Sequence, residues 1–343
     1  MTGLRIISRA NWAWFCGVAA LAVVAFVGCG GPTPLDGSGH TGAAGRGGTG
    51  TGAAIDLTPQ GSGSTTGPAT GTGTGTGSVA AVWPPPGFVN VTNSTTGAYA
   101  LGPDPNSPEG IAAAGGSSSG PTPPTECAAL FGVVRDFKMG NQPGGHPDFE
   151  TAPVGLETGI VASTLGTDGK PVYAATTSAS TTGADHFNQW YNDVPGTNMS
   201  FVLALHLVDV NGTATFSATQ PKSFFPLDDY AGTTVGFGNE GQPHNFSFTT
   251  EIHTAFNYKG GETFAFAGDD DVWVFIDKKL VIDLGGRHAQ TTKSVAIDSL
   301  GLTKGNDYEI AVFHAERHTD QSNFQIQTTL AFSNCGEVGG IVY

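Results

Sequence analysis

The chain has 343 residues, a formal net charge of −15 at pH 7 and only 13% charged residues. A charge this negative argues against a nucleic-acid-binding protein and against binding to anionic membranes, because both need basic surfaces. It is compatible with divalent cations and neutral molecules as partners.

Residues 1–28 are predicted to be a lipoprotein signal peptide, which we exclude from the fold. An apolar stretch from Trp12 to Val27 ends in Gly28 and Cys29. A small residue followed by Cys in this position resembles a bacterial lipobox, in which the Cys becomes the lipidated first residue of the mature chain. The resemblance implies export and attachment to the outer membrane or cell surface of a bacterium through a lipid on Cys29. An ordinary secretory signal and a single membrane span are the alternatives.

Residues 29–125 are predicted to be a disordered tether. They consist mainly of Gly, Thr, Ser, Ala and Pro, with a Gly-Thr repeat at 71–77. Such a segment buries too little apolar surface to offset its chain entropy. Aromatic residues return in one island, at 83–91 and 99–101. Two interpretations of the island stay open: it docks on the folded domain or binds a partner, or it is an apolar patch of the disordered tether.

Residues 126–343 are predicted to fold as one all-β domain. Apolar residues recur with a period of two in seven segments, which predicts strands rather than helices. These segments are 201–210, 246–256, 263–266, 272–276, 294–297, 309–314 and 324–331. Turn residues at 259–262 and 277–279 predict two tight hairpins, and one short helix is expected near 185–193. The predicted fold class is therefore an antiparallel β-sandwich or barrel.

Two cysteines, Cys127 and Cys335, bracket the folded domain. The two ends of a domain tend to lie close together, and cysteine pairs tend to oxidise outside the cytoplasm. We therefore expect a disulfide between Cys127 and Cys335, with two unpaired thiols as the alternative.

Three consecutive carboxylates, Asp269, Asp270 and Asp271, stand directly before the apolar segment 272–276. Like charges this close repel one another, and their removal from water costs free energy. The sequence therefore predicts that a cation, a set of N–H donors or full solvation stabilises them. From the residues alone, a solvated acidic turn at a hairpin is the simplest interpretation.

A second group of metal-binding residue types is His314, Glu316 and His318. Their spacing of two places them on one face of a strand, and two imidazoles with a carboxylate suit zinc or another transition metal. This alternative metal cluster would make the protein a metalloenzyme. No pattern of a nucleophile or a general base accompanies it, so we favour a network of structural hydrogen bonds for these residues.

Eight short motifs resemble those of the fibro-slime domain, in the same order along the chain. Two of them are Gly-Asp-Asp-Asp-Val-Trp-Val-Phe-Ile at 268–276 and His-Ala-Glu-Arg-His at 314–318. The others lie at 134–137, 146–150, 187–191, 225–228, 236–241 and 244–246. The fibro-slime domain resembles a branch of the protective-antigen-type β-barrels, which include lectins and adhesins. Its members occur on bacterial surfaces and in slime and matrix proteins.

The resemblance implies a calcium site. Lectins of the protective-antigen type hold calcium with an Asp-Asp pair that precedes a strand and an Ile-Asp-Gly turn. Here Ile276 and Asp277 set the register. Asp269 and Asp270 therefore match the pair, and Asp271 does not.

In those lectins a nearby loop adds oxygen ligands and a sugar completes the coordination of the ion. The corresponding loop here is 319–323, between the last two predicted strands, and its candidate ligands are Asp320 and Asn323. Calcium takes six to eight oxygens, a number that carboxylates, amides, carbonyls and sugar hydroxyls reach together.

We therefore predict a non-catalytic, calcium-assisted carbohydrate-binding or adhesion domain on a lipoprotein tether. Its expected partner is a glycan or an extracellular polysaccharide, and no nucleic acid. A structural component of extracellular matrix or slime, which acts through protein–protein contacts, is the first alternative. A metalloenzyme that uses His314, Glu316 and His318 is the second.

Overall fold

The computed structural model describes residues 83–85, 87–92, 94–106, 127, 129–219 and 223–338, together with the backbone of 341–342. The predicted signal peptide, Cys29 and most of the predicted tether lie outside the described residues. Within the described part of the chain, no helix is long and apolar enough to cross a membrane.

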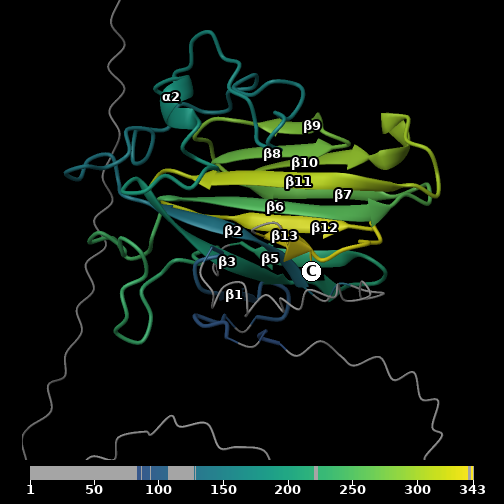
Figure 1. Cartoon of the computed structure of the whole chain (residues 1–343), viewed down its shortest axis with the longest axis horizontal. Coiled ribbons are helices and arrows are strands. Elements are labelled where there is room, and N and C mark those ends of the chain that lie inside the picture. Colours follow the sequence, from purple (N-terminus) through teal and green to yellow (C-terminus); the bar gives the residue numbers. More distant parts are fainter. Residues whose placement is uncertain are drawn as a thin grey trace, which may run out of the picture. The chain divides into compact units, whose positions relative to one another are not determined.

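Two antiparallel sheets form a β-sandwich that does not close into a barrel (Figure 1). The seven-stranded sheet consists, in spatial order, of β1 (Tyr99–Leu101), β3 (Asn198–His206), β2 (Ala129–Phe137), β6 (Phe248–Asn257), β11 (Asp307–Glu316), β8 (Asp271–Ile276) and β9 (Lys279–Leu284). The five-stranded sheet consists of β10 (Thr291–Ala296), β7 (Thr263–Gly268), β12 (Phe324–Thr328), β5 (Ala214–Ala218) and β4 (Val208–Asp209). The remaining elements are α2 (Ala184–Phe187), the 3-10 helix η1 (Ile297–Leu300) and the ribbon of β13 (Glu337–Val338) and β14 (Ile341–Val342). The all-β prediction is confirmed.

Alternation along β8 divides its side chains between two apolar clusters. Val272, Val274 and Ile276 join the main core, which contains residues of both sheets. Trp273 and Phe275 point to the opposite, outer face of the seven-stranded sheet and join a second cluster. All five side chains are buried, so both faces of this strand are covered, as the uninterrupted apolar run requires.

The outer face of the seven-stranded sheet is partly covered by the segment 138–197, which connects β2 to β3. Its helix α2 and its loops are the teal segments near β8 and β9 in Figure 1. Trp190 of this segment is fully buried against Trp273. The helix is shorter than predicted, because the Asn198 side chain bonds the carbonyls of Gln189 and Asn192 and holds that stretch in turns.

Part of the predicted tether, residues 83–106, belongs to the folded domain. β1 pairs with β3 at the edge of the seven-stranded sheet, and Phe88 and Ala100 are buried with Val202 in a third apolar cluster. Assigning all of 29–125 to the tether is therefore wrong for this stretch, and the docked interpretation of the aromatic island is correct. Apolar burial and strand hydrogen bonds offset its chain entropy, which the Gly-Thr repeats cannot do.

One of the two predicted hairpins is confirmed and the other is wrong. β8 and β9 pair across Asp277 and Lys278, whose φ angles of 51° and 61° suit a type I′ turn. Residues 259–262 instead lead from β6 to β7, which lie in different sheets. Periodicity identifies strands but not their partners, and the sequence also missed β2 and β5.

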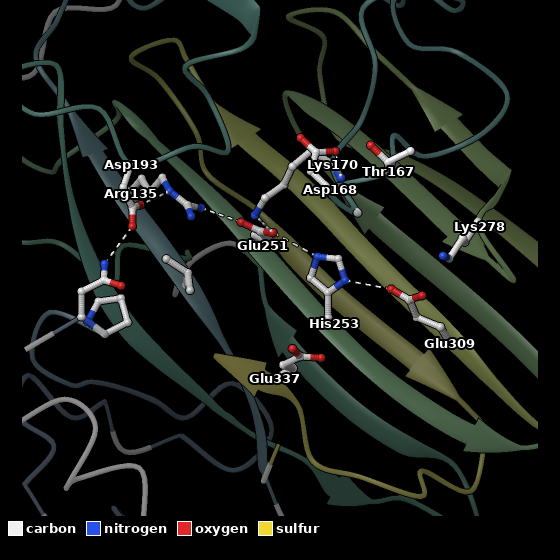
Figure 2. Close-up of a pocket in the computed structure, with 14 residues that line it drawn as sticks. Arg135, Thr167, Asp168, Lys170, Asp193, Glu251, His253, Lys278, Glu309 and Glu337 are labelled. Atoms are coloured by element: carbon white, nitrogen blue, oxygen red, sulfur yellow. Dashed lines mark hydrogen bonds and ion pairs between the residues drawn. The ribbon is translucent and has the colours of Figure 1, made fainter. Parts of the chain in front are cut away.

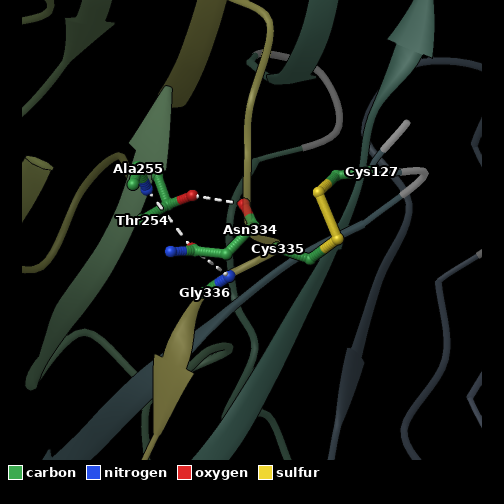
Figure 3. The surroundings of a disulfide bond; sticks show 6 residues. All are labelled: Cys127, Thr254, Ala255, Asn334, Cys335 and Gly336. Atoms are coloured by element: carbon green, nitrogen blue, oxygen red, sulfur yellow. Dashed lines mark hydrogen bonds between the residues drawn. A yellow bond between two sulfur atoms is a disulfide. The ribbon is translucent and has the colours of Figure 1, made fainter. Parts of the chain in front are cut away.

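The predicted disulfide between Cys127 and Cys335 is present, and it links positions 208 residues apart (Figure 3). Next to it, the Asn334 side chain accepts hydrogen bonds from the backbone N–H groups of Ala255 and Gly336. Gly336 has a φ of 132°, and a Cβ there would lie 2.3 Å from the carbonyl oxygen of Phe131. The C-terminal segment is thereby fastened to β6 and passes close to β2.

Candidate functional site

Two connections between the sheets run next to each other at one end of the sandwich. The first is Asp269–Asp270, between β7 and β8, and the second is 317–323, between β11 and β12. β7 pairs with β12 in one sheet, and β8 pairs with β11 in the other. Both connections must therefore start and finish beside each other. We call this place the acidic crossover.

The acids of the crossover are buried. Asp269 is 3% exposed, Asp270 is 6% exposed and Asp271 is fully buried. A solvated turn is therefore the wrong interpretation of the triplet, and the connection they occupy is a crossing between sheets rather than a hairpin. Their charge has to be matched inside the protein, by a bound cation or by a proton.

Asn323 lies against Asp269. From the sequence it is predicted near the Asp pair, in the loop that connects β11 to β12. Its backbone N–H and its side-chain amide donate to the two carboxylate oxygens of Asp269, at 2.5 and 2.8 Å. Gly268 allows this approach, because a Cβ there would come within 2.8 Å of the Asn323 carbonyl oxygen. Asp320 is exposed, and among the described residues no hydrogen bond or ion pair joins it to the Asp pair.

Asp271 is held separately, by Arg317. Strand alternation turns Asp271 to the outer face of the seven-stranded sheet, where the fully buried Arg317 guanidinium contacts it at 2.5 and 2.7 Å. Its other oxygen accepts a hydrogen bond from the N–H of Gly286 at 2.6 Å. The guanidinium also lies 4.4 Å from the ring centroid of Trp190. Asp271 is therefore occupied in a structural ion pair, apart from Asp269 and Asp270.

Glu316 is the third carboxyl group near the Asp pair, and the sequence had placed it in the histidine cluster. It is fully buried at the end of β11, and its Oε2 has no hydrogen-bond partner among the described residues. Burial raises its pKa well above the usual value, and the charges of Asp270 and Asp269 raise it further. Glu316 lies on the inner face of β11, together with the core residues Ile310 and Val312. Strand alternation could have predicted this from the sequence.

Burial also disfavours the ionised forms of Asp269 and Asp270. Burial raises the pKa of Asp269, with Asn323 opposing the shift. Burial also raises the pKa of Asp270 well above its usual value, although Arg317 opposes that shift and donates its backbone N–H at 3.2 Å. The three carboxyl groups thus create a negative potential that the neighbouring donors only partly offset.

His314, Glu316 and His318 do not form the alternative metal cluster. His314 is fully buried, and burial lowers its pKa to about 4. The neutral ring donates from Nε2 to the carbonyl oxygen of Asp269 at 2.7 Å. His318 leaves the strand and its Nδ1 lies 3.9 Å from Glu150. Within the described part of the chain, no group of three or more His, Cys, Asp or Glu side chains is arranged to hold a metal.

The oxygens at the acidic crossover suit a hard cation better than a transition metal. Asp269, Asp270 and Glu316 are not arranged as a metal-binding group in this structure. Their carboxylate oxygens would have to come together around a cation, with Asn323 beside Asp269. The unpartnered Oε2 of Glu316 is a buried acceptor without a donor, which a cation would satisfy. Calcium takes six to eight oxygens, and four of the six carboxylate oxygens here already accept hydrogen bonds. Amide, backbone or ligand oxygens would therefore have to complete its coordination.

Residues 226–339 match the PA14 domain, and the match includes both connections of the acidic crossover. The chain is 38% identical over 212 residues to Protein psiQ of Dictyostelium discoideum, a match that covers 58% of this chain and 22% of that protein. It is 41% identical over 211 residues to Protein psiR of the same organism, covering 58% and 21%. This chain therefore spans about a fifth of the length of these two relatives.

Among solved structures, the beta-glucosidase from Kluyveromyces marxianus in complex with glucose is similar, with a TM-score of 0.22 and 12% sequence identity. The similarity covers 57% of this chain and 16% of that one.

Proposed function

We propose, from the premise that this chain carries a PA14 domain and resembles the fibro-slime proteins, that it is a non-catalytic, calcium-assisted glycan-binding protein. PA14 is an adhesion-type domain that is often carbohydrate-binding, which supports a glycan as the general class of partner. Calcium and the identity of the glycan are the further parts of the proposal.

The observation that carries the proposal is the burial of three poorly matched carboxyl groups at the acidic crossover. Burial raises the pKa of Asp269, Asp270 and Glu316. The charges of Asp270 and Asp269 raise the pKa of Glu316 further, and the charge of Asp269 raises that of Asp270. The desolvation of an ionised carboxylate that is buried without a counter-charge costs several kcal/mol per ion. A bound cation would offset this cost, and it would let the Asn323 loop and the Asp pair stabilise each other.

In this site, Asp269 and Asp270 would hold calcium from the first connection, and Asn323 and Glu316 would face it from the second. Bound there, calcium would offer coordination positions to the vicinal hydroxyl groups of a sugar. The buried Asp271–Arg317 pair would keep both connections in place. Asp320 is exposed on the same loop, where it could contact the glycan rather than the ion.

A glycan array read in calcium and in EDTA tests the proposal. The protein must retain residues 83–106, because β1 completes the seven-stranded sheet. We expect calcium-dependent glycan binding by the native chain and by the exposed control variant Asp209→Asn, and loss of that binding in Asp270→Asn. An array on which no glycan loses its binding both in EDTA and in Asp270→Asn would contradict the calcium role. A blank array together with self-assembly of the chain would favour the structural matrix component.

Anchoring through Cys29 is a separate proposal that the sequence alone supports. The relatives reported above come from a eukaryote, so a bacterial host is part of this proposal. Expression in a bacterium with an alkyne-labelled fatty acid should label the native chain and not Cys29→Ser. Equal labelling of both, or of neither, would contradict lipidation at Cys29.

A further inference from the structure

The outer face of the seven-stranded sheet is covered in two places and open between them. The segment 138–197 covers β8 and part of β11. The third apolar cluster, which includes Phe88 and Val338, covers β2 and β3 at the other side. Between them lies a pocket of about 600 Å³, within the range of pockets that hold small ligands. We call it the charged trench; its principal residues are Arg135, Lys170, Asp193, Glu251, His253 and Glu309.

Figure 2 shows that these side chains are joined in one network across β2, β6 and β11. Glu251, 4% exposed, accepts hydrogen bonds from Arg135 at 2.6 Å, from His253 at 3.0 Å and from Lys170. His253 is bonded through its other ring nitrogen to Glu309, at 3.0 Å. Side chains fixed in this way lose little conformational entropy when a ligand binds.

The network also joins elements that are far apart in the sequence. Arg135 bonds Asp193 at 2.7 Å, and Asp193 in turn accepts from Asn106 at 2.9 Å. Lys170 belongs to the covering segment 138–197, and its side chain contacts Glu251 of β6. The polar surface of the trench thus includes side chains from Asn106, from β2 and from the segment 138–197, in addition to those of β6 and β11. Hydrogen bonds hold these side chains in place before any ligand binds.

The trench presents hydrogen-bond donors and acceptors together. Lys170 can donate three hydrogen bonds through Nζ, and His253 uses only one of the two oxygens of Glu309. Lys278 and Glu337 also line the trench, Lys278 beyond Glu309 and Glu337 below His253 in the view of Figure 2. The lining contains three Lys or Arg and one His against five Asp or Glu. Burial lowers the pKa of His253, but the hydrogen bonds that its ring donates to Glu251 and Glu309 outweigh burial and raise this pKa to about 9. The charges therefore nearly balance at neutral pH.

We propose that the charged trench is a second glycan subsite, which binds a chain of neutral sugar units through their hydroxyl groups and without calcium. A hydroxyl group both donates and accepts, so it can use the two kinds of group that alternate along the trench. Hydrogen bonds to charged partners are the strong ones, and a nearly balanced charge gives no advantage to a polyanion or a polycation. This inference rests on the proposed glycan-binding function and adds a subsite that lies on a different face of the fold.

The test measures binding of an array of neutral oligosaccharides in EDTA. The trench variant is Lys278→Gln/Glu337→Gln, and the matched control is Lys279→Gln/Asp209→Asn, which changes the same charges outside the trench. Lys279 follows Lys278 as the first residue of β9, and its side chain is 66% exposed. We expect native and control proteins to bind the same oligosaccharides in EDTA, and the trench variant to bind them at least tenfold more weakly.

A second measurement needs no variant. A bound oligosaccharide should protect Lys278 from an amine-reactive reagent in the native chain, while Lys279 stays reactive. Equal reactivity of the two lysines with and without a saturating oligosaccharide would overturn the proposal, and so would equal binding by the trench and control variants.

The outcomes separate this inference from the proposed function. If every oligosaccharide that binds requires calcium and none binds in EDTA, the trench is overturned and the calcium-assisted function stands. Binding in EDTA that is lost in the trench variant and kept in Asp270→Asn supports the trench, whatever calcium does. An array that stays blank in calcium and in EDTA overturns both.

Discussion

The charged trench and the acidic crossover both contain a buried carboxylate on a strand of the seven-stranded sheet, and the two carboxylates respond in opposite ways. Burial by itself raises the pKa of Glu251 and of Glu316. At Glu251, the hydrogen bond from His253 and the charges of Arg135 and Lys170 outweigh burial and hold the pKa below its usual range. At Glu316, the nearest charges are those of Asp270 and Asp269, and they add to the effect of burial.

The difference indicates in which region the charge of the buried carboxylate is balanced without a ligand. In the trench, each buried acid has a cationic partner, so the side chains are ready to accept a neutral molecule. At the acidic crossover, the arginine is paired with Asp271, and the other acids lack an equivalent partner. The same type of residue is thus structural in one region and a candidate cation ligand in the other.

The largest effect is expected from Arg317→Met. The change leaves Asp271 fully buried without its counter-charge, and removal of one partner of a buried ion pair costs about 3–5 kcal/mol. We expect the free energy of unfolding to fall by about 4–5 kcal/mol, near the upper end of this range. Urea unfolding followed by tryptophan fluorescence measures the change. The exposed control Lys279→Met should stay within about 0.5 kcal/mol of the native chain. A loss that small in Arg317→Met would contradict the structural role of the pair.

Glu251→Gln is expected to destabilise the trench by about 3 kcal/mol, because Arg135, Lys170 and His253 then share a buried site without their central anion. Chemical unfolding at pH 7 measures the change. The exposed variant Glu337→Gln at the trench rim serves as the control. If Glu251→Gln is as stable as the control, the network does not hold the trench together.

His253 gives the trench a pH dependence. Its folded-state pKa of about 9 lies above the ordinary value of 6.5. Its contribution is therefore fully present below pH 6.5 and is lost as the pH rises through 9. From pH 7 to pH 9 we expect the native chain to lose about 2 kcal/mol more than His253→Gln. Identical pH profiles in this window would show that His253 is not held protonated by Glu251 and Glu309.

Glu316→Gln should have the smallest effect, and the opposite sign to Glu251→Gln. The raised folded-state pKa of Glu316 means that its contribution is present below about pH 4.5 and is lost as the pH rises. Gln cannot ionise, so in EDTA at pH 7 to 8 the variant should be as stable as the native chain or more stable. In calcium the native chain should gain more stability than the variant. A clear loss of stability in EDTA would contradict the account of the acidic crossover.

Much of the fold follows from the sequence, and so does the separation of one acid of the triplet from the other two. The period of two predicted the all-β class, and the cysteines that bracket the domain predicted their disulfide. The register set by Ile276 and Asp277 separated Asp271 from Asp269 and Asp270. The structure agrees, because alternation turns Asp271 outward to Arg317.

The rest depends on which strands become neighbours, and periodicity does not carry that information. Arg135 and Glu251 are 116 residues apart, and only the pairing of β2 with β6 brings them together in the trench. Glu316 reaches the Asp pair because two connections between sheets run side by side. Tyr99–Leu101 looked like part of a tether because three residues are too few to predict a strand without the edge of β3 beside them.

Isothermal titration of the full chain with calcium is the most direct test of the central claim, that the acidic crossover is a cation site. The native chain and Asp209→Asn should show saturable binding, and Asp270→Asn should bind at least tenfold more weakly or not at all. Absence of calcium binding by the native chain, or equal binding by Asp270→Asn and Asp209→Asn, would contradict the claim.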